Sequence, residues 1–329
     1  MKKLALVATV LAMTTGSTFA ADMAVKALKA PPPPAFDPWD FAFGSGIVSD
    51  YVFRGVTQSN HKPSVSVYFE PRYNINKDVQ LYVGLGGESI SFPNRAAGEV
   101  DIYGGIRPTF GAFAFDIGVW GYLYPGGTCF FGAPTDTAGK PLSAECANNF
   151  ILNGAVVKKD VSFFEVYDKV NYTINDSWTI GATEFYTPNF LNTGAWGNYA
   201  SFTGKYVAPA TVFGTSGVGM YVSGEFGRQW LGTSDSFYGV PAFPNGIKFA
   251  DYNTWNIGVG FTYKVFTLDL RYSDSTLSKG NCNAFTSAFN GTGTTNVTPI
   301  NPSGVGTNWC GATGIVKLSA DLTVLSNLK

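Results

Sequence analysis

The sequence predicts an all-β protein: a transmembrane, antiparallel, up-and-down β-barrel of about twelve strands, with long extracellular loops and short periplasmic turns. Three observations support this fold class. Apolar and polar residues alternate over stretches of about ten residues. No long apolar run occurs beyond the N-terminal segment. Finally, short connections alternate with long ones along the chain.

The composition excludes several other classes of protein. The chain is 45% hydrophobic and 16% aromatic but only 14% charged, which is little charge for a soluble domain. A helical membrane protein is disfavoured because no run of about 18 apolar residues follows the N-terminus. The near balance of 22 basic and 23 acidic residues argues against nucleic acid as a partner.

The N-terminus has the features of an export signal. Lys2 and Lys3 precede the apolar residues 4–13, and small residues lead up to Ala20, so we expect residues 1–20 to be a cleaved signal peptide. Residues 21–38 include four consecutive prolines and should form an extended, Pro-rich periplasmic linker; a disordered leader is the alternative. The barrel is then expected over residues 39–329.

Residues 64–73 show the alternation most clearly. Val65, Val67 and Phe69 fall on one face, and Ser66 and Glu70 fall on the other. A period of two makes a strand with unlike faces, and about ten residues cross a membrane when the strand is tilted. The same pattern predicts strands at residues 41–56, 64–73, 79–91, 99–109, 112–124, 161–173, 178–187, 199–207, 217–230, 251–264, 266–273 and 315–324.

One residue does not fit its strand. Asp168 falls on the apolar face of residues 161–173. A β-bulge would redirect its side chain, so we expect one at this position.

The connections differ in length in a regular way. Residues 74–78 and 174–177 are short turns, whereas residues 125–160, 231–250 and 274–314 are long loops. Short turns on one rim and long loops on the other are the asymmetry of bacterial outer-membrane barrels. We therefore expect the protein to lie in the outer membrane, in contact with its lipid.

The four cysteines lie in two of the predicted loops. Cys129 and Cys146 share one loop, and Cys282 and Cys310 share another, so we expect disulfides Cys129–Cys146 and Cys282–Cys310 among the three possible pairings. A cysteine metal site is disfavoured because no Cys-x-x-Cys spacing occurs and the chain has one histidine. We expect no metal and no cofactor.

His61 is that single histidine, and it lies between the first two predicted strands. A hydrolase of the serine type would need it as the general base. A solvated loop histidine is the simpler interpretation, so we expect no catalytic residue and no enzyme.

The polar faces of the strands carry charges of both signs, which should point into the lumen, the space enclosed by the barrel. A water-filled pore would keep these charges solvated, whereas a filled barrel would pair them across the interior. Frequent Gly, Ser and Thr at inward positions favour a narrow pore. The main lumen residues are expected to be Asp50, Arg54, Glu70, Arg72, Glu88, Asp101, Arg107, Asp116, Glu165, Lys169, Asp269 and Arg271, with Glu99, Glu225, Asp321, Lys205, Lys264 and Lys317 on the same faces.

Several short motifs resemble a known family. The run SDYVFRGVTQS at residues 49–59, followed by KPS at 62–64, is similar to the opening signature of the TorF family of porins, also called the Gcw_chp family. Weaker matches occur at residues 82–90, 101–105, 165–167 and 187–190. The resemblance implies an outer-membrane barrel with a transport function, and it implies no catalytic residues.

Two functions from different classes follow from these features. The first is a porin-like channel for passive diffusion of small hydrophilic solutes. The second is a closed structural or surface-interaction barrel whose disulfide-bridged external loops bind partners.

Overall fold

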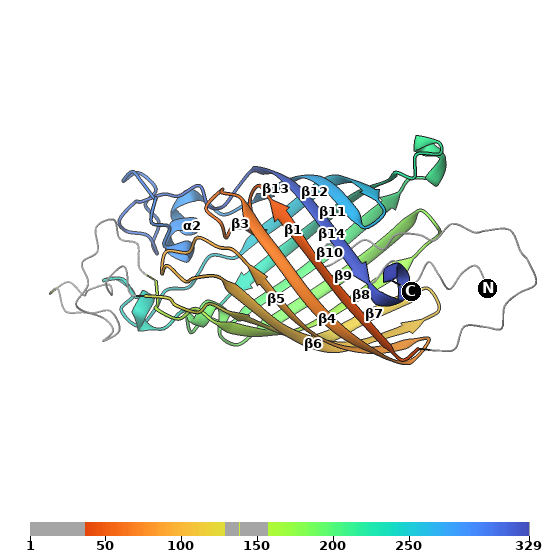
Figure 1. The fold of residues 1–329 in the computed structure, drawn as a ribbon. Coiled ribbons are helices and arrows are strands. Elements are labelled where there is room, and N and C mark those ends of the chain that lie inside the picture. The colour runs from red at the N-terminus through yellow and green to blue at the C-terminus, as the bar shows by residue number, and fades with distance from the viewer. Residues whose placement is uncertain (1–36, 129–137, 139–156, 329) are drawn as a thin grey trace, which may run out of the picture.

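The chain forms a closed antiparallel barrel. The computed structural model describes residues 37–128, 138 and 157–328. Twelve strands pair in chain order, and β1 closes the barrel by pairing with both β4 and β14 (Figure 1). The predicted fold class is therefore confirmed. The expected signal peptide lies outside the described residues, as does nearly all of the expected linker.

The barrel strands agree closely with the alternating stretches of the sequence. Most of their ends fall within a few residues of the predicted ends. Their bounds are β1 Trp39–Val48, β4 Ser64–Asn76, β5 Val79–Glu88, β6 Glu99–Phe110, β7 Phe113–Leu123, β8 Phe163–Thr173, β9 Trp178–Thr187, β10 Gly197–Val207, β11 Gly219–Leu231, β12 Tyr252–Tyr263, β13 Phe266–Ser275 and β14 Thr313–Thr323.

The remaining elements are short and lie in the connections or at the C-terminus. Two-residue strands β2 (Val52–Phe53) and β3 (Val56–Thr57) pair with each other between β1 and β4. The helical segments are η2 Phe190–Asn192, η3 Ala210–Phe213, η4 Ser236–Tyr238, α2 Lys279–Thr286 and the π-helix η5 Val324–Leu328. No helix in the described part of the chain is long and apolar enough to cross a bilayer.

The first predicted strand is too long. The sequence pattern continues to residue 56, but β1 ends at Val48 and the chain then leaves the barrel wall. Arg54 and Gly55 have positive φ angles of 48° and 74°, so the backbone reverses sharply between β2 and β3. Residues 49–63 form a connection that we call the inward hairpin.

The bulge expected at Asp168 is also wrong. Asp168 pairs in regular register with Ile117 of β7 and Glu184 of β9. Its side chain is exposed on the outer face, and Glu184, which is exposed as well, is its cross-strand neighbour. Asn198 donates a hydrogen bond to Glu184 at 2.8 Å. We have no physical account of why two acidic residues adjoin on this face.

The two faces of the wall differ sharply in chemistry. Outward side chains are apolar and exposed, such as Val67 at 59% and Phe202 at 74%, whereas the inward Glu70 is 3% exposed. Aromatic residues gather at the strand ends near the short turns, where the ring centroids of Trp39 and Tyr73 lie 4.9 Å apart. An apolar outer band with aromatic residues at its edge is how a barrel contacts lipid.

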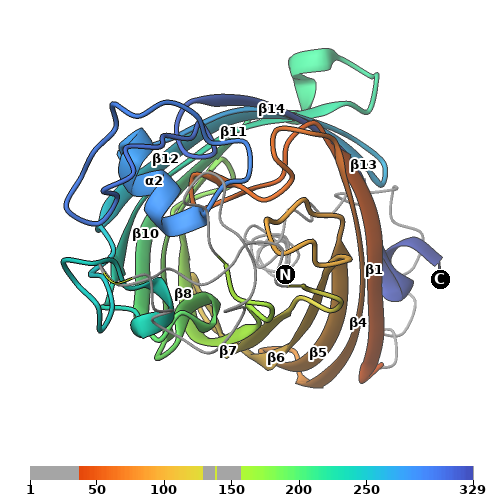
Figure 2. The ribbon, with the colours of Figure 1, turned by 90° about the vertical axis from the view of Figure 1, so that its left-hand side faces the viewer.

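The two rims of the barrel are unequal. The turns after β4, β6, β8 and β12 are short, whereas the other rim carries the inward hairpin and the described connecting residues 89–98, 124–128, 157–162, 188–196, 232–251 and 276–312. At this long-loop end, α2 and the connections fold over part of the opening (Figure 2). An even strand number, an apolar belt and unequal rims identify the chain as an outer-membrane β-barrel.

Candidate functional site

The candidate site is the lumen, where charged side chains from most of the wall meet. The structure places the predicted residues on inward positions of β4 to β8 and β13, while Asp50 and Arg54 lie on the inward hairpin rather than on a barrel strand. Most of these side chains are buried, as are Glu70, Asp116, Glu165 and Lys169. Their contacts divide the lumen into a short-turn half and a long-loop half.

Arg107 is the centre of the short-turn half. Its Nη1 and Nη2 donate to the two oxygens of Glu70 at 2.7 and 3.1 Å, and its Nε donates to Asp116 Oδ2 at 3.2 Å. The guanidinium lies 3.6 Å from the ring centroid of Tyr82, and Arg72 donates to Glu70 at 2.6 Å. We call these residues the arginine network. Fork-shaped donors meeting planar carboxylates give well-oriented, charge-assisted hydrogen bonds.

A second arginine is held in the same way on the other side of the lumen. Arg271 donates from Nε and Nη2 to the two oxygens of Asp269, both at 3.0 Å. It also donates to Asn256 at 2.5 Å and to Ser223 at 2.8 Å. Tyr221 donates to Asp269 at 2.7 Å. The lumen therefore presents fixed charges of both signs on opposite walls.

Inward glycines let tyrosine rings lie flat against the wall. A Cβ at Gly84 would be 2.2 Å from Tyr103 Cζ, and one at Gly260 would be 2.0 Å from Tyr221 Cζ. Only glycine permits this approach of a ring to the strand. Tyrosine rings therefore cover these two inward glycines.

Arg54 brings the inward hairpin across the lumen. It donates to both oxygens of Glu165 on β8 at 2.9 and 2.7 Å and to Gln229 on β11 at 3.1 Å. Its guanidinium also lies 4.5 Å from the ring centroid of Tyr199. Burial disfavours its charge, but Glu165 raises the Arg54 pKa above its ordinary value. The hairpin is thus tied to strands on the far wall.

His61 holds the same hairpin to another loop. Its Nδ1 lies 2.7 Å from Asp50 Oδ2, and its Nε2 lies 2.9 Å from the carbonyl oxygen of Asn308. Both ring nitrogens thus face oxygen atoms, one on the inward hairpin itself and one on another connection. The geometry supports a clamp between the inward hairpin and the connection before β14.

Apolar side chains close much of the long-loop half. They come from the connections, from α2 and from the adjoining strand ends, and they form one buried cluster, which we call the apolar cap. A cavity of about 60 Å³ lies within the cap. Aromatic residues in predicted loops were the sequence signal that could have revealed it. Its main members are Phe92, Tyr124, Phe190, Phe237, Tyr238, Phe249, Tyr252, Phe285 and Trp309.

The disulfide expected between Cys282 and Cys310 is confirmed. The two Cα atoms lie 6.0 Å apart, and the bond joins α2 to the segment before β14. The backbone of Cys310 also forms an isolated antiparallel β-bridge with Val56 of the inward hairpin. The backbone N–H of Thr57 donates to the carbonyl oxygen of Trp309 at 2.9 Å. The bond therefore holds the cap against the hairpin. The expected Cys129–Cys146 bond lies outside the described residues.

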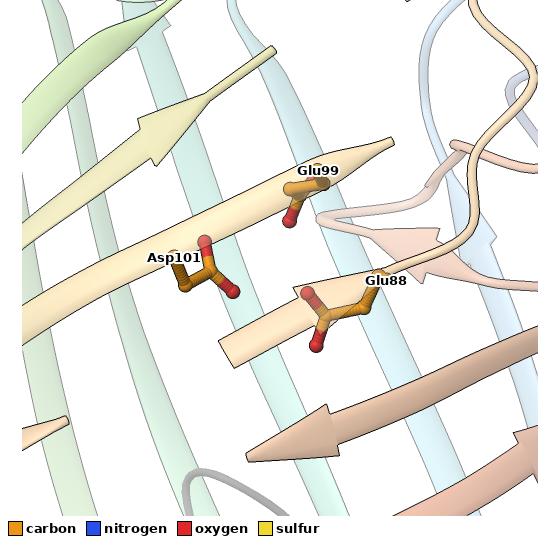
Figure 3. Close-up of side chains that lie close together, drawn as sticks. All are labelled: Glu88, Glu99 and Asp101. Carbon is orange, nitrogen blue, oxygen red and sulfur yellow. The ribbon is translucent and has the colours of Figure 1, made fainter. Parts of the chain in front are cut away.

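Three carboxylates gather at the long-loop ends of β5 and β6. Glu88 ends β5 and pairs in register with Glu99, which begins β6, and Asp101 follows on the same face. Oxygen atoms of the three lie within 4.8 Å of one another, and their side chains point toward one another (Figure 3). Sequence reasoning placed each residue in the lumen but did not bring them together. We call them the acidic group.

The family resemblance is confirmed for part of the chain. A family model described as "Bacterial protein of unknown function (Gcw_chp)" matches residues 34–140. These residues include the inward hairpin, the arginine network and the acidic group. No relative is found among the curated proteins.

Several solved structures of outer-membrane proteins are similar to this chain. An outer membrane channel from Pseudomonas putida F1 has a TM-score of 0.43 at 10% identity, with 91% of this chain and 100% of that chain covered. The NanC porin has a TM-score of 0.39 at 7% identity, covering 86% and 100%. LpxR from Salmonella typhimurium has 0.38 at 8% identity, covering 85% and 99%. The chain's own strand pairing establishes the architecture.

Proposed function

We propose that this protein is an outer-membrane channel with a narrow, charged lumen that passes small hydrophilic solutes. The observation that carries the proposal is the inward wall, where Arg107 and Arg271 face carboxylates and the apolar side chains face outward. A polar lumen wall lowers the cost of moving a hydrated solute through an apolar bilayer. A filled apolar core would not do so.

Charges of both signs favour small neutral or zwitterionic solutes. Each arginine of the short-turn half is paired with a carboxylate, as in Arg107–Glu70 and Arg271–Asp269. Paired charges leave little net potential to repel either ion, while their hydrogen-bonding groups still contact polar solutes. The tyrosine rings that lie flat on the wall keep their bulk out of the passage.

The long-loop half is the constriction. The Arg54–Glu165 ion pair and the apolar cap occupy it. The same observation favours the second candidate, a closed barrel that acts through its external loops. The two functions differ in one property: a channel conducts when the hairpin is released, whereas a closed barrel stays sealed.

Conductance in planar lipid bilayers tests the proposal. We expect small conductance steps from the refolded wild-type protein and larger ones from the double variant Arg54→Gln/Glu165→Gln, which removes the crossing ion pair without leaving a buried charge alone. Neutralising the exposed pair Lys77 and Asp78 in a short turn, as Lys77→Gln/Asp78→Asn, is the matched control and should conduct like wild type.

Two results would contradict the channel. If wild type and the double variant both remain sealed, the closed barrel is the better description. If both conduct, but vesicles that contain the protein swell equally fast in small sugars and in solutes too large for a narrow lumen, the proposed size selectivity is wrong.

A further inference from the structure

The acidic group differs from the other buried carboxylates of the lumen. Glu70, Asp116, Glu165 and Asp269 each lie within 4.0 Å of an arginine nitrogen. In the described ranges, no ion pair of this kind includes Glu88, Glu99 or Asp101. Like charges held this close repel strongly where water is scarce, so the group needs a positive charge or bound protons.

Asp101 points to a ligand for a separate reason. Its side chain is 4% exposed, and its Oδ1 is buried without a hydrogen-bond partner. The Oε2 atom of Glu88 is buried and unpartnered as well. Buried carboxylate oxygens are nearly always satisfied in folded proteins. In Figure 3 both side chains turn toward the space that they share with Glu99.

Glu99 is held in place from outside the group. Tyr51 of the inward hairpin donates to Glu99 Oε1 at 2.7 Å. This hydrogen bond orients one carboxylate before any ion arrives. The register pair of Glu88 with Glu99 and the pair of Gly86 with Asp101 fix the other two on rigid strands. Oriented oxygen donors on a rigid wall are what a metal site requires.

We propose that Glu88, Glu99 and Asp101 bind a calcium ion at the long-loop end of the lumen. Ca²⁺ takes oxygen ligands at about 2.3–2.6 Å, so two ligands on opposite sides of the ion lie about 5 Å apart. One oxygen from each of the three carboxylates lies within 4.8 Å of the others, so all three can reach one such ion. Mg²⁺ usually keeps several waters and is held by one or two carboxylates, so a site of three carboxylates suits Ca²⁺ better.

The ion would fasten part of the long-loop end. Glu88 and Glu99 flank the connection 89–98, which carries Phe92 into the apolar cap. Tyr51 links the same site to the inward hairpin. Binding therefore stabilises the hairpin, the connection and the cap together. This inference stands apart from the proposed channel, because a closed barrel would bind the ion equally well.

Terbium luminescence tests the site directly. Tb³⁺ resembles Ca²⁺ in size and ligand preference. Trp120 and Tyr122 on β7 pair in register with Tyr103 and Asp101 on β6, so their rings lie near the site and can sensitise Tb³⁺ emission. Titrating the refolded full-length barrel in detergent with Tb³⁺ should give sensitised emission. Added Ca²⁺ should displace Tb³⁺ and abolish this emission, whereas Mg²⁺ should do so only at a much higher concentration. The variants Asp101→Asn and Glu88→Gln should weaken Tb³⁺ binding by at least about tenfold.

The control variant is Glu184→Gln, which removes one acidic charge from the outer face of β9. It should bind Tb³⁺ like wild type. Equal binding by wild type, Asp101→Asn and Glu88→Gln would overturn the proposal, as would the absence of emission that Ca²⁺ displaces.

Thermal unfolding gives a second readout that does not depend on luminescence. In EDTA, Asp101→Asn should unfold at a higher temperature than wild type, because it removes repulsion. In Ca²⁺ at about 100 times its Kd, wild type should gain about 5 °C or more while Asp101→Asn gains little. A wild-type melting temperature that is the same in Ca²⁺ and in EDTA would refute the site. A misfolded Asp101→Asn would melt below wild type in EDTA, whereas a folded variant that has only lost binding would melt above it.

Discussion

The two halves of the lumen are held together by different physics. In the short-turn half, Arg107 and Arg271 are paired with carboxylates on the wall itself. In the long-loop half, Arg54 of the inward hairpin pairs with Glu165 across the lumen, and an apolar cap with a disulfide packs beside this ion pair. Ion pairs within a strand and between nearby strands fix the wall, whereas packed loops fix its closure, so the halves should respond to different changes.

The largest effect should come from Arg107→Ala in the short-turn half. The change leaves Asp116 without its arginine and Glu70 with only Arg72, and both carboxylates are buried. Removing one partner of a buried ion pair costs about 3–5 kcal/mol. Urea unfolding of the barrel in lipid vesicles measures the loss. The exposed-pair variant Lys77→Ala should lose less than about 0.5 kcal/mol.

If Arg107→Ala costs no more than Lys77→Ala, the arginine network does not hold the wall. The two halves would then differ less than their contacts indicate.

The double variant Cys282→Ser/Cys310→Ser should have the next largest effect, confined to the long-loop half. The bond closes a sequence separation of 28 residues, so its loss destabilises the closed loop by about 3 kcal/mol in the chain-entropy description. Hydrogen exchange should show faster amide exchange in α2 and residues 300–310 while β6 and β7 stay protected. Equal acceleration in β6 would mean that the halves form one cooperative unit.

The smallest effect should come from Tyr51→Phe, which removes one hydrogen bond between the hairpin and Glu99. A buried hydrogen bond to a charged group contributes about 2 kcal/mol. Burial and the nearby Glu99 raise the pKa of Tyr51 well above 10.0. The folded state thus holds the phenol proton more tightly than the unfolded state, and this stabilisation is complete below about pH 10 and decreases above it.

Unfolding measured at pH 8 and pH 11 checks this prediction. Wild type should lose more stability than Tyr51→Phe between the two pH values. An identical loss in both proteins would show that Tyr51 makes no such contribution.

The strands and their two faces were predictable from the sequence because side-chain direction in a strand has a period of two and depends only on local order. Val67 and Glu70 belong to one alternating stretch and fall on its opposite faces, and the barrel exposes the first to lipid and buries the second. The rim asymmetry followed from counting residues between strands. The end of β1 was predicted wrongly, because the alternation continues into the inward hairpin, where Arg54 and Gly55 turn the chain.

The partners inside the barrel were decided by the tertiary structure alone. The alternation predicts that Arg54, Arg107 and Glu99 face inward, but it does not predict which side chain each of them contacts. Strand register places Glu88 opposite Glu99, and barrel closure brings Arg54 within reach of Glu165, 111 residues away in the chain. Sequence order sets the chemistry of each face, whereas register and closure in three dimensions set which charges are paired and which remain together without an arginine.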